Sequence, residues 1–120
     1  IQDNVGGLQT DSAEHGWIDV DPVPGAIVVN LGDCMQVLTN DRYRAAVHRV
    51  LPMTTSTRMS IPYFFNPPRD MVVEPIPAVA AGEPRYRSFP FRQLIDARGA
   101  DNYADEGRPD AQISDYLVIR

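Results

Sequence analysis

Apolar and polar positions alternate over short stretches in the first two thirds of the chain, which predicts strands rather than helices. Residues 17–20 alternate in this way, and we expect them to form a hairpin with residues 8–10 across the polar loop 11–16. Residues 26–31 form a continuous, largely β-branched run, which is typical of a strand buried on both faces.

Three further stretches, residues 43–51, 58–65 and 71–76, also predict strands. The polar loop 52–57 joins the first two of them. Residues 34–38 are too few for their periodicity to distinguish one helical turn from a short strand, so both structures remain open here.

The pattern changes after residue 77, where a loop leads into a predicted helix. Pro90 suits the first turn of this helix, and Gly99 is placed to end it in a left-handed conformation. Four residues at helical spacing share one face of it: Phe91, Leu94, Ile95 and Arg98. Residues 116–119 either add an edge strand or pack on the body of the protein.

Short strands at intervals of about ten residues, separated by turns with Gly and Pro, favour an all-β architecture with one late helix over β-α-β units. The candidates are a sandwich, a jelly roll or a barrel. We assign residues 1–77 to the β-rich core and residues 78–120 to a C-terminal loop, helix and tail that pack on it.

Composition narrows the function classes. The net charge of −5 leaves no basic stripe for phosphates, so we expect no nucleic-acid partner. The longest apolar run has four residues, whereas a membrane-spanning helix needs about 20, so we expect no membrane span. The lone Cys34 and the lack of a basic leader favour a reducing, cytoplasmic setting, with Cys34 as a small buried apolar residue.

The chain has only two histidines, and His48 is the candidate functional one. Strand alternation places it on the same face as Ala46 and Val50, so we expect its ring to point inward or nearly so. Taken alone, this pattern favours a core histidine that is hydrogen-bonded to the backbone. His15 lies in the polar loop 11–16, where a solvated loop role is expected.

Arg58 and Ser60 are two residues apart on a predicted strand, so their side chains share a face. A guanidinium binds a carboxylate through two parallel hydrogen bonds, and a neighbouring hydroxyl donates a third, which predicts a carboxylate clamp. The alternative is a surface strand with a solvated Arg and an incidental Ser.

Taken together, the chain resembles the Fe(II)/2-oxoglutarate-dependent dioxygenases of the isopenicillin N synthase-like group. The resemblance extends over nearly the whole chain, in the family's order, and its C-terminal segments are similar to those of microbial members. The segments that carry it are residues 2–9, 17–20, 24–33, 38–43, 48–50, 58–62, 64–67, 102–107 and 112–116.

This resemblance implies the C-terminal portion of a double-stranded β-helix, a form of jelly roll, with iron held by a His-x-Asp pair and a distant histidine. His48 matches the distant histidine, and Arg58 and Ser60 match the pair that binds the far carboxylate of 2-oxoglutarate. Two imidazoles and one carboxylate suit Fe(II) and leave positions open for the cosubstrate and O₂. No residue of the chain is assigned a further catalytic role.

The sequence contains no His-x-Asp motif, and by the resemblance this motif belongs just before Ile1. His15 does not replace it. We therefore expect the N-terminal half of the same enzyme, as a separate chain or a missing segment, to complete the site, and the isolated chain to be inactive.

Two other interpretations remain open. One is a non-catalytic jelly-roll binding or interaction module without a complete metal site, and the other is an unrelated β-sandwich. For the enzyme, a small-molecule substrate is expected, and the residues do not distinguish hydroxylation, desaturation and cyclisation.

Overall fold

The computed structural model of the 120-residue chain describes residues 1–52, 55–80, 82–101 and 111–118. It contains two compact units, each built from two separate stretches of sequence. The first unit comprises residues 1–30 and 45–65, and the second unit comprises residues 31–44 and 66–120. The boundary expected after residue 77 stays a prediction.

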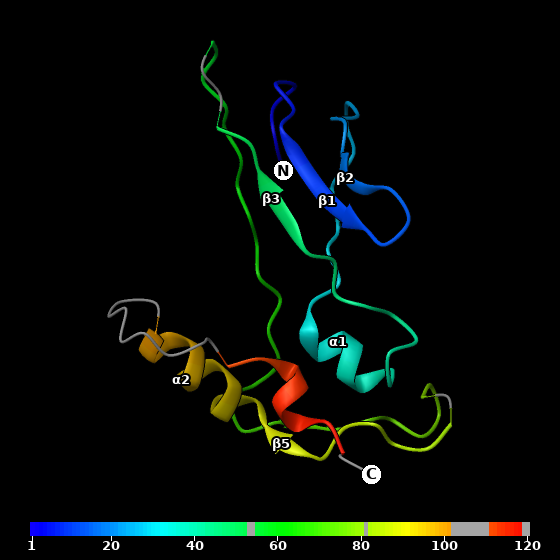
Figure 1. The fold of residues 1–120 in the computed structure, drawn as a ribbon. Helices are drawn as coiled ribbons and strands as arrows, with labels where there is room; N and C mark the ends of the chain where they lie inside the picture. Colours follow the sequence, from blue (N-terminus) through cyan, green and yellow to red (C-terminus); the bar gives the residue numbers. More distant parts are fainter. Residues whose placement is uncertain (53–54, 81, 102–110, 119–120) are drawn as a thin grey trace. The chain divides into compact units, whose positions relative to one another are not determined.

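The first unit holds a three-stranded antiparallel sheet in which β1 (Leu8–Ser12) lies between β2 (Gly16–Asp19) and β3 (His48–Val50), as Figure 1 shows. The hairpin expected from the alternation of residues 17–20 is confirmed, because β1 and β2 pair across a short turn. Gly16 ends this turn at a φ of 67°, a left-handed conformation that glycine adopts without steric cost.

The register of the sheet sorts its side chains onto two faces, because directly opposed residues of antiparallel strands share a face. Thr10 lies opposite both Ile18 and His48, whereas Gln9 lies opposite both Asp19 and Arg49. The neighbours His48 and Arg49 therefore belong to opposite faces of the same strand.

The face that carries Gln9 is held by a row of polar contacts. Gln9 donates from Nε2 to Asp19 Oδ1 at 2.9 Å and accepts at Oε1 from Arg49 Nε at 2.9 Å. The Arg49 guanidinium lies over the ring of Trp17, with Cζ 4.0 Å from the ring centroid. These contacts join all three strands across one face.

The apolar run 26–31 does not form the expected strand. It is extended without ladder pairing, and the side chains of Ile27 and Val29 are 68% and 77% exposed. A continuous apolar run shows that a strand tolerates burial on both faces, but burial also requires neighbouring strands. The part of the chain that the structure describes places none beside this run.

The three other predicted strands are shorter than expected, and the one at 71–76 pairs only over Val72 and Val73. The stretch 43–51 pairs only over β3, and the stretch 58–65 contributes only an isolated bridge between Gln2 and Ser60. Of the joining loop, residues 53 and 54 lie outside the described residues. Tyr63 and Phe65 are 85% and 90% exposed. The apolar pattern thus predicted more strand pairing than the structure has. As in the run 26–31, pairing also requires neighbouring strands, which the pattern does not show.

The second unit combines helices with a short two-stranded sheet. The segment 34–38, left open above, is helical and belongs to α1 (Asp33–Leu38). The other elements are β4 (Val72–Val73), β5 (Phe89–Pro90), α2 (Phe91–Asp101) and the 3₁₀ helix η1 (Ile113–Tyr116); Figure 1 labels β5 and α2. Helices and strands thus occur together, and the all-β class is only part of the description.

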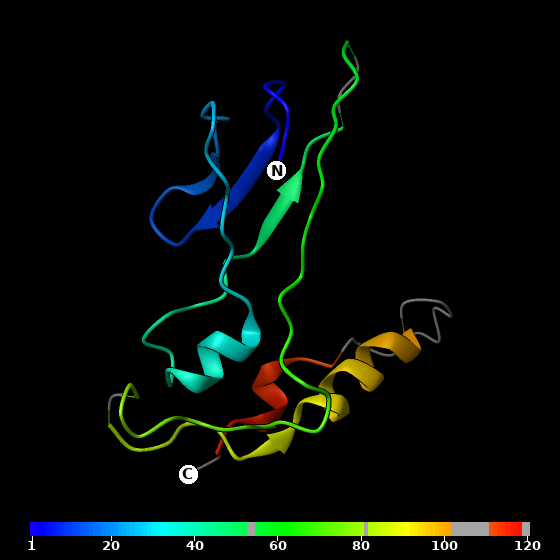
Figure 2. The same ribbon diagram turned by 180° about the vertical axis from the view of Figure 1, so that it is seen from behind.

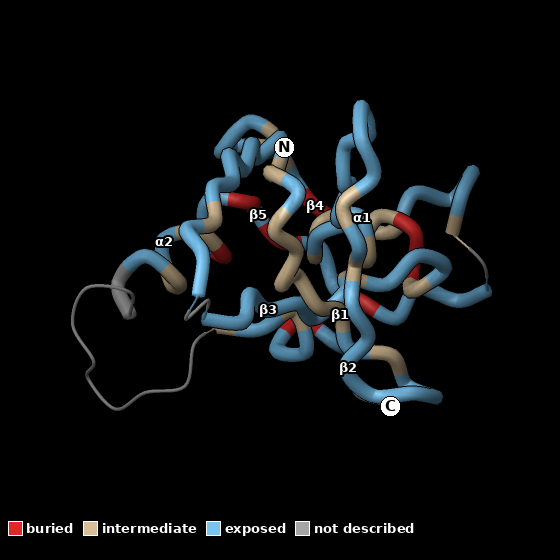
Figure 3. Tube along the Cα trace, turned by 90° about the horizontal axis from the view of Figure 1, so that it is seen from above, coloured by how far each residue is buried: buried red, intermediate tan, exposed pale blue. Residues whose placement is uncertain are grey.

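A single apolar cluster forms the core of the second unit. Figure 2 shows the ribbon from behind, with η1 in red and α2 in yellow to orange. The ring of Tyr116 at the end of η1 stacks on Phe89 of β5 with centroids 3.8 Å apart. The buried members of the cluster are Val37, Val73, Tyr86, Phe89, Phe91, Leu94 and Tyr116. The strands of the first unit, by contrast, are largely exposed or half-buried in Figure 3.

The face predicted for the late helix is confirmed in α2. Phe91 and Leu94 are buried, and Arg98 lies on the same face because it donates to Ala111 O at 2.9 Å and to Asp33 Oδ2 at 2.5 Å. The predicted end at Gly99 is wrong, since the helix continues to Asp101 and Gly99 keeps an ordinary negative φ. Glycine permits a left-handed cap but does not impose one.

Of the two expected outcomes for residues 116–119, the described part of this stretch shows packing on the body and no edge strand. Tyr116 packs in the core, and Leu117 forms an isolated bridge with Tyr86 rather than a strand. Ile119 and the segment 102–107 lie outside the described residues. Of the helices that the structure describes, none is long and apolar enough to cross a membrane.

Candidate functional site

The three residues singled out in the sequence line one cavity of the first unit. The cavity has a volume of about 260 Å³, and His48, Arg58 and Ser60 all contribute to its wall. Gln2 and Leu8 are among the other lining residues. The structure therefore brings a histidine, a guanidinium and a hydroxyl together although twelve positions of sequence separate His48 from Ser60.

His48 is placed by β3, on the face of the sheet that also carries Leu8 and Val50 of the cavity wall. Its Nδ1 lies 3.0 Å from the carbonyl oxygen of Ala46. Because a carbonyl only accepts hydrogen bonds, Nδ1 carries the proton, and in the neutral ring Nε2 keeps its lone pair. This is the arrangement in which a histidine is ready to bind a metal through Nε2.

The expectation that His48 points into the core is wrong, because its side chain is exposed. β3 is an edge strand of three residues, and the described part of the chain lays no further strand against it. Alternation correctly predicted the face of the sheet but not how much of that face would be covered.

Arg58 is half-buried and makes three hydrogen bonds. Its Nε donates to Gly6 O at 2.7 Å, one terminal nitrogen donates to Ser60 Oγ at 2.9 Å, and the other donates to Gln2 Oε1 at 3.0 Å. The prediction that the Arg58 and Ser60 side chains share a face is confirmed. Two of the five N–H donors of the guanidinium remain for a ligand.

The charge of Arg58 is not compensated by a carboxylate. Within the described ranges, no Asp or Glu oxygen lies within 4.0 Å of its guanidinium, whereas Arg85 and Arg98 each have such a partner. A half-buried cation with spare donors in a cavity is suited to an anionic ligand, above all to a planar carboxylate.

Gln2 and Gly6 belong to this site but were not identified from the sequence. Both contact Arg58 across more than fifty residues of chain. Both lie in the segment 2–9 that carries part of the family resemblance, which is the one signal that pointed to this stretch. Their contact with Arg58 depends on the pairing of residues 1–3 with residues 59–61, which no local pattern reveals.

A complete metal site is not formed by the residues that the structure describes, since they contain no group of three His, Cys, Asp or Glu side chains able to hold an ion. His48 supplies one imidazole, which fits one position of a two-histidine, one-carboxylate site. His15 is mostly exposed at the β1–β2 turn, with Nε2 3.8 Å from Glu14, which confirms its solvated loop position.

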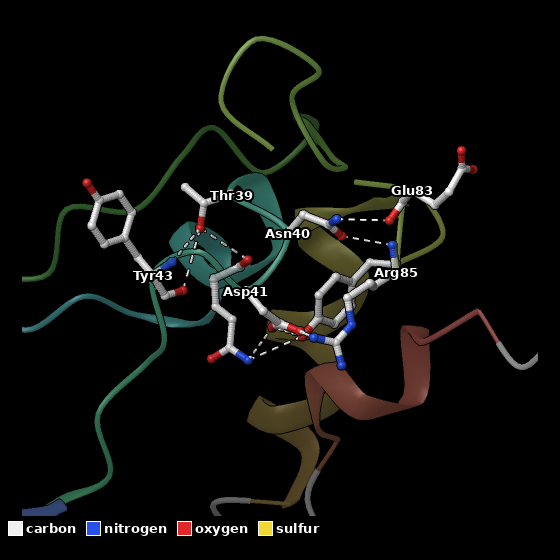
Figure 4. Close-up of polar contacts among 8 residues, drawn as sticks. Thr39, Asn40, Asp41, Tyr43, Glu83 and Arg85 are labelled. Carbon is white, nitrogen blue, oxygen red and sulfur yellow. Dashed lines mark hydrogen bonds and ion pairs between the residues drawn. The ribbon is translucent and has the colours of Figure 1, made fainter. Parts of the chain in front are cut away.

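A second polar cluster lies in the second unit, where Asn40 and Asp41 follow α1 in left-handed conformations (Figure 4). Asp41 Oδ1 accepts from Tyr86 OH at 2.5 Å and from Gln36 Nε2 at 2.8 Å, and its Oδ2 lies 2.5 Å from an Arg85 nitrogen. Burial opposes ionisation of Asp41, but these hydrogen bonds and the nearby arginines outweigh it and lower the pKa.

Asn40 completes this cluster by binding the backbone of the 83–85 segment. Its Nδ2 donates to Glu83 O at 2.9 Å, and its Oδ1 accepts from Arg85 N at 2.8 Å. These contacts, drawn in Figure 4, fix the segment that leads into the core residue Tyr86. We therefore assign the cluster to structure rather than to ligand binding.

Cys34 of α1 is half-buried beside the core cluster. Burial and the adjacent carboxylate of Asp33 raise the pKa of its thiol. The thiol is therefore neutral near pH 7. The expectation of a buried Cys34 is met only in part, because the residue is half-buried.

Residues 1–67, more than half of the chain, match the 2OG-Fe(II) oxygenase superfamily, and the chain belongs to this superfamily. It is 38% identical over 115 residues to feruloyl CoA ortho-hydroxylase 1 of Arabidopsis thaliana, covering 87% of this chain and 32% of that protein. It is also 45% identical over 103 residues to the 2-oxoglutarate-Fe(II) type oxidoreductase hxnY of Emericella nidulans, covering 83% and 29%.

Among solved structures, the chain is similar to a rice dioxygenase for auxin oxidation, with a TM-score of 0.80 and 30% identity over 98% of this chain and 40% of that chain. The chain spans about a quarter to a third of the curated relatives that it matches. The similarity to these relatives thus concerns only a part of their length.

Proposed function

We propose that this chain is the C-terminal portion of a non-haem Fe(II)/2-oxoglutarate-dependent oxygenase that oxidises a small molecule by hydroxylation, desaturation or cyclisation. The observation that carries the proposal is the half-buried Arg58 guanidinium, which has no carboxylate partner among the described residues and lines one cavity with His48. Membership of the 2OG-Fe(II) oxygenase superfamily supports the proposal. The similarity to the Arabidopsis feruloyl CoA ortho-hydroxylase 1 supports it as well. The proposed architecture of the complete core is a jelly roll.

In this proposal Arg58 and Ser60 bind the far carboxylate of 2-oxoglutarate. The two spare N–H donors of the guanidinium match the two oxygens of the carboxylate, and the Ser60 hydroxyl donates to the same group. Because Gly6 and Gln2 already hold the guanidinium, little side-chain entropy is lost when the ligand binds.

His48 contributes one ligand to Fe(II) through Nε2, with Ala46 O fixing the tautomer. When bound, the iron and 2-oxoglutarate supply the oxidising power for the reaction. The remaining ligands, a His-x-Asp pair, come from the N-terminal half of the same enzyme, as a separate chain or a preceding segment. We propose a cytoplasmic location and that the 120-residue chain alone does not turn over substrate.

An anaerobic titration with Fe(II) and 2-oxoglutarate tests this proposal. It is run on the 120-residue chain and on a chain extended upstream through a His-x-Asp motif, following the weak visible charge-transfer band of the complex. We expect the band only in the extended chain and its loss in the His48→Ala variant, with His15→Ala as the matched control. A missing band in both chains, or one that survives His48→Ala, contradicts the assignment.

The alternative is a binding module that keeps the carboxylate site without turnover. The observation that favours it is the single imidazole in the cavity wall, since no group of three metal ligands occurs among the described residues. A module of this kind binds dicarboxylates equally well before and after His48→Ala, and adding Fe(II) leaves the affinity unchanged. For the oxygenase, Fe(II) strengthens 2-oxoglutarate binding in the extended chain.

A further inference from the structure

Gln2 lies in the cavity wall beside the two residues of the proposed carboxylate clamp. Its backbone forms an antiparallel bridge with Ser60, and bridged residues of antiparallel strands point their side chains to the same side. The orientation of the carboxamide is fixed by its partner, because the Arg58 guanidinium only donates and Oε1 must accept the 3.0 Å hydrogen bond.

The groups that hold Arg58 share one property, which is that none carries a net charge. They are the Gly6 carbonyl, the Ser60 hydroxyl and the Gln2 carboxamide. Arg85 and Arg98 are held differently, since Arg85 pairs with the Asp41 carboxylate and Arg98 pairs with the Asp33 carboxylate. Neutral acceptors orient the Arg58 guanidinium and leave its positive charge available.

We propose that Gln2 is a positioning residue of the anion site: it orients the Arg58 guanidinium for a ligand carboxylate without neutralising its charge. The inference rests on the proposed function, because the ligand is the far carboxylate of 2-oxoglutarate. A glutamate in place of Gln2 retains a similar shape and an acceptor oxygen but places an internal carboxylate against Arg58. The internal carboxylate then competes with the ligand and repels it.

The chain offers a matched control on the other face of the sheet. Gln9 accepts from Arg49 Nε at 2.9 Å, nearly the length of the Gln2–Arg58 hydrogen bond, and it does not line the cavity. Gln9→Glu therefore makes the same change of charge beside an arginine. Gln9→Glu also removes the hydrogen bond to Asp19. Its effect on the fold is therefore at least as large as that of Gln2→Glu, which makes it a strict control.

The experiment measures binding of 2-oxoglutarate to the 120-residue chain by NMR, following the Nε–H resonance of Arg58. We expect Gln2→Glu to weaken binding on the order of 10- to 100-fold, the effect of a carboxylate a few ångströms from the guanidinium. Gln2→Met, which removes only the acceptor, weakens it about fivefold. Gln9→Glu leaves the affinity unchanged, and Arg58→Ala abolishes binding.

The outcomes separate this inference from the proposed function. If Arg58→Ala abolishes binding while both Gln2 variants bind as tightly as the parent chain, the positioning role is wrong and the proposed function stands. If Arg58→Ala binds like the parent chain, or the parent chain shows no binding, the carboxylate clamp fails.

The ligand-free spectrum tests the positioning role even when the clamp fails. Gln2 accepts from a terminal nitrogen of Arg58, so a guanidinium held by Gln2 gives a protected Arg58 Nη–H signal that exchanges faster with solvent in Gln2→Met and not in Gln9→Glu. An unchanged exchange rate in Gln2→Met overturns the inference.

Discussion

The contacts of Arg58 depend on the planar shape of its guanidinium as much as on its charge. Its guanidinium reaches Gly6, Ser60 and Gln2 at the same time, through three different nitrogens. An ammonium group has no planar fork and cannot make these contacts together with two parallel bonds to a carboxylate.

We therefore expect Arg58→Lys to weaken 2-oxoglutarate binding by about 2 kcal/mol, although it keeps the charge. Isothermal titration calorimetry of the 120-residue chain measures this loss. Arg49→Lys, on the opposite face of the sheet, is the control that leaves the affinity unchanged. Equal affinities for the parent chain and Arg58→Lys would mean that only the charge matters.

Asp41 predicts a pH dependence of stability. Its pKa is lowered in the folded chain, so its ionised form contributes stability above the unfolded pKa and loses it as pH falls through the folded value. The side chain is only 7% exposed, and we expect Asp41→Asn to lower the free energy of unfolding by about 2 kcal/mol at pH 7. Urea unfolding shows this difference shrinking below about pH 4.

The control for this prediction is Asp70→Asn, because Asp70 is paired with Arg92 at 3.4 Å but is largely exposed. We expect no measurable change from it at either pH. Tyr86 makes stability depend on pH at the alkaline end, because burial and its hydrogen bond to Asp41 raise the pKa of its hydroxyl. Its contribution is present below the unfolded pKa and is lost as pH rises through the folded value.

At the scale of elements, α2 contains a glycine that the helix does not require. A Cβ added at Gly99 meets no described atom within 4 Å, and the backbone there is helical. Gly99→Ala should raise the free energy of unfolding by about 0.5–1 kcal/mol, because alanine loses less backbone entropy. Thermal unfolding measures the gain.

Gly25→Ala is the matched control for this substitution. A Cβ at Gly25 also meets nothing within 4 Å, but its φ of 77° is a conformation that L-residues adopt at a cost. We expect it to destabilise the chain by about 1 kcal/mol. A loss of stability in Gly99→Ala would show that the helix end needs glycine after all.

The elements that the sequence predicted well are those whose evidence is local. The β1–β2 hairpin joins adjacent strands, and the buried face of α2 repeats within two turns, so short-range patterns suffice. The strand predicted at 26–31 and most of that at 58–65 are absent because pairing depends on neighbours from elsewhere. The end of α2 was missed because a glycine tolerates either conformation.

At the scale of the whole molecule, the same limit applies to the site. His48, Arg58 and Ser60 were predicted from the order of family motifs, and one cavity joins them. Gln2 and Gly6 were missed because their contacts with Arg58 span more than fifty residues. Single-residue chemistry was thus readable in the sequence, whereas the groups that orient it were not.

The two units differ in how much apolar surface they expose. The second unit buries an aromatic cluster, whereas the first unit exposes Tyr63, Phe64 and Phe65 almost completely. We expect the 120-residue chain to enhance the fluorescence of an apolar-surface dye at neutral pH, and Phe64→Ser with Phe65→Ser to reduce it. Phe89→Ser, in the buried core, should increase it, and the reverse ranking would contradict this distribution of apolar surface.

Trp17 is the one tryptophan of the chain, and its ring lies under the guanidinium of Arg49. Arg49 is the immediate neighbour of His48 in β3, so a shift of this strand by one residue removes the cation from the ring and turns the imidazole away from its face. The emission of Trp17 is therefore an intrinsic optical signal for the strand that carries the candidate metal ligand. The register of β3 against β1 can thus be followed in solution without a label, a metal or a substrate.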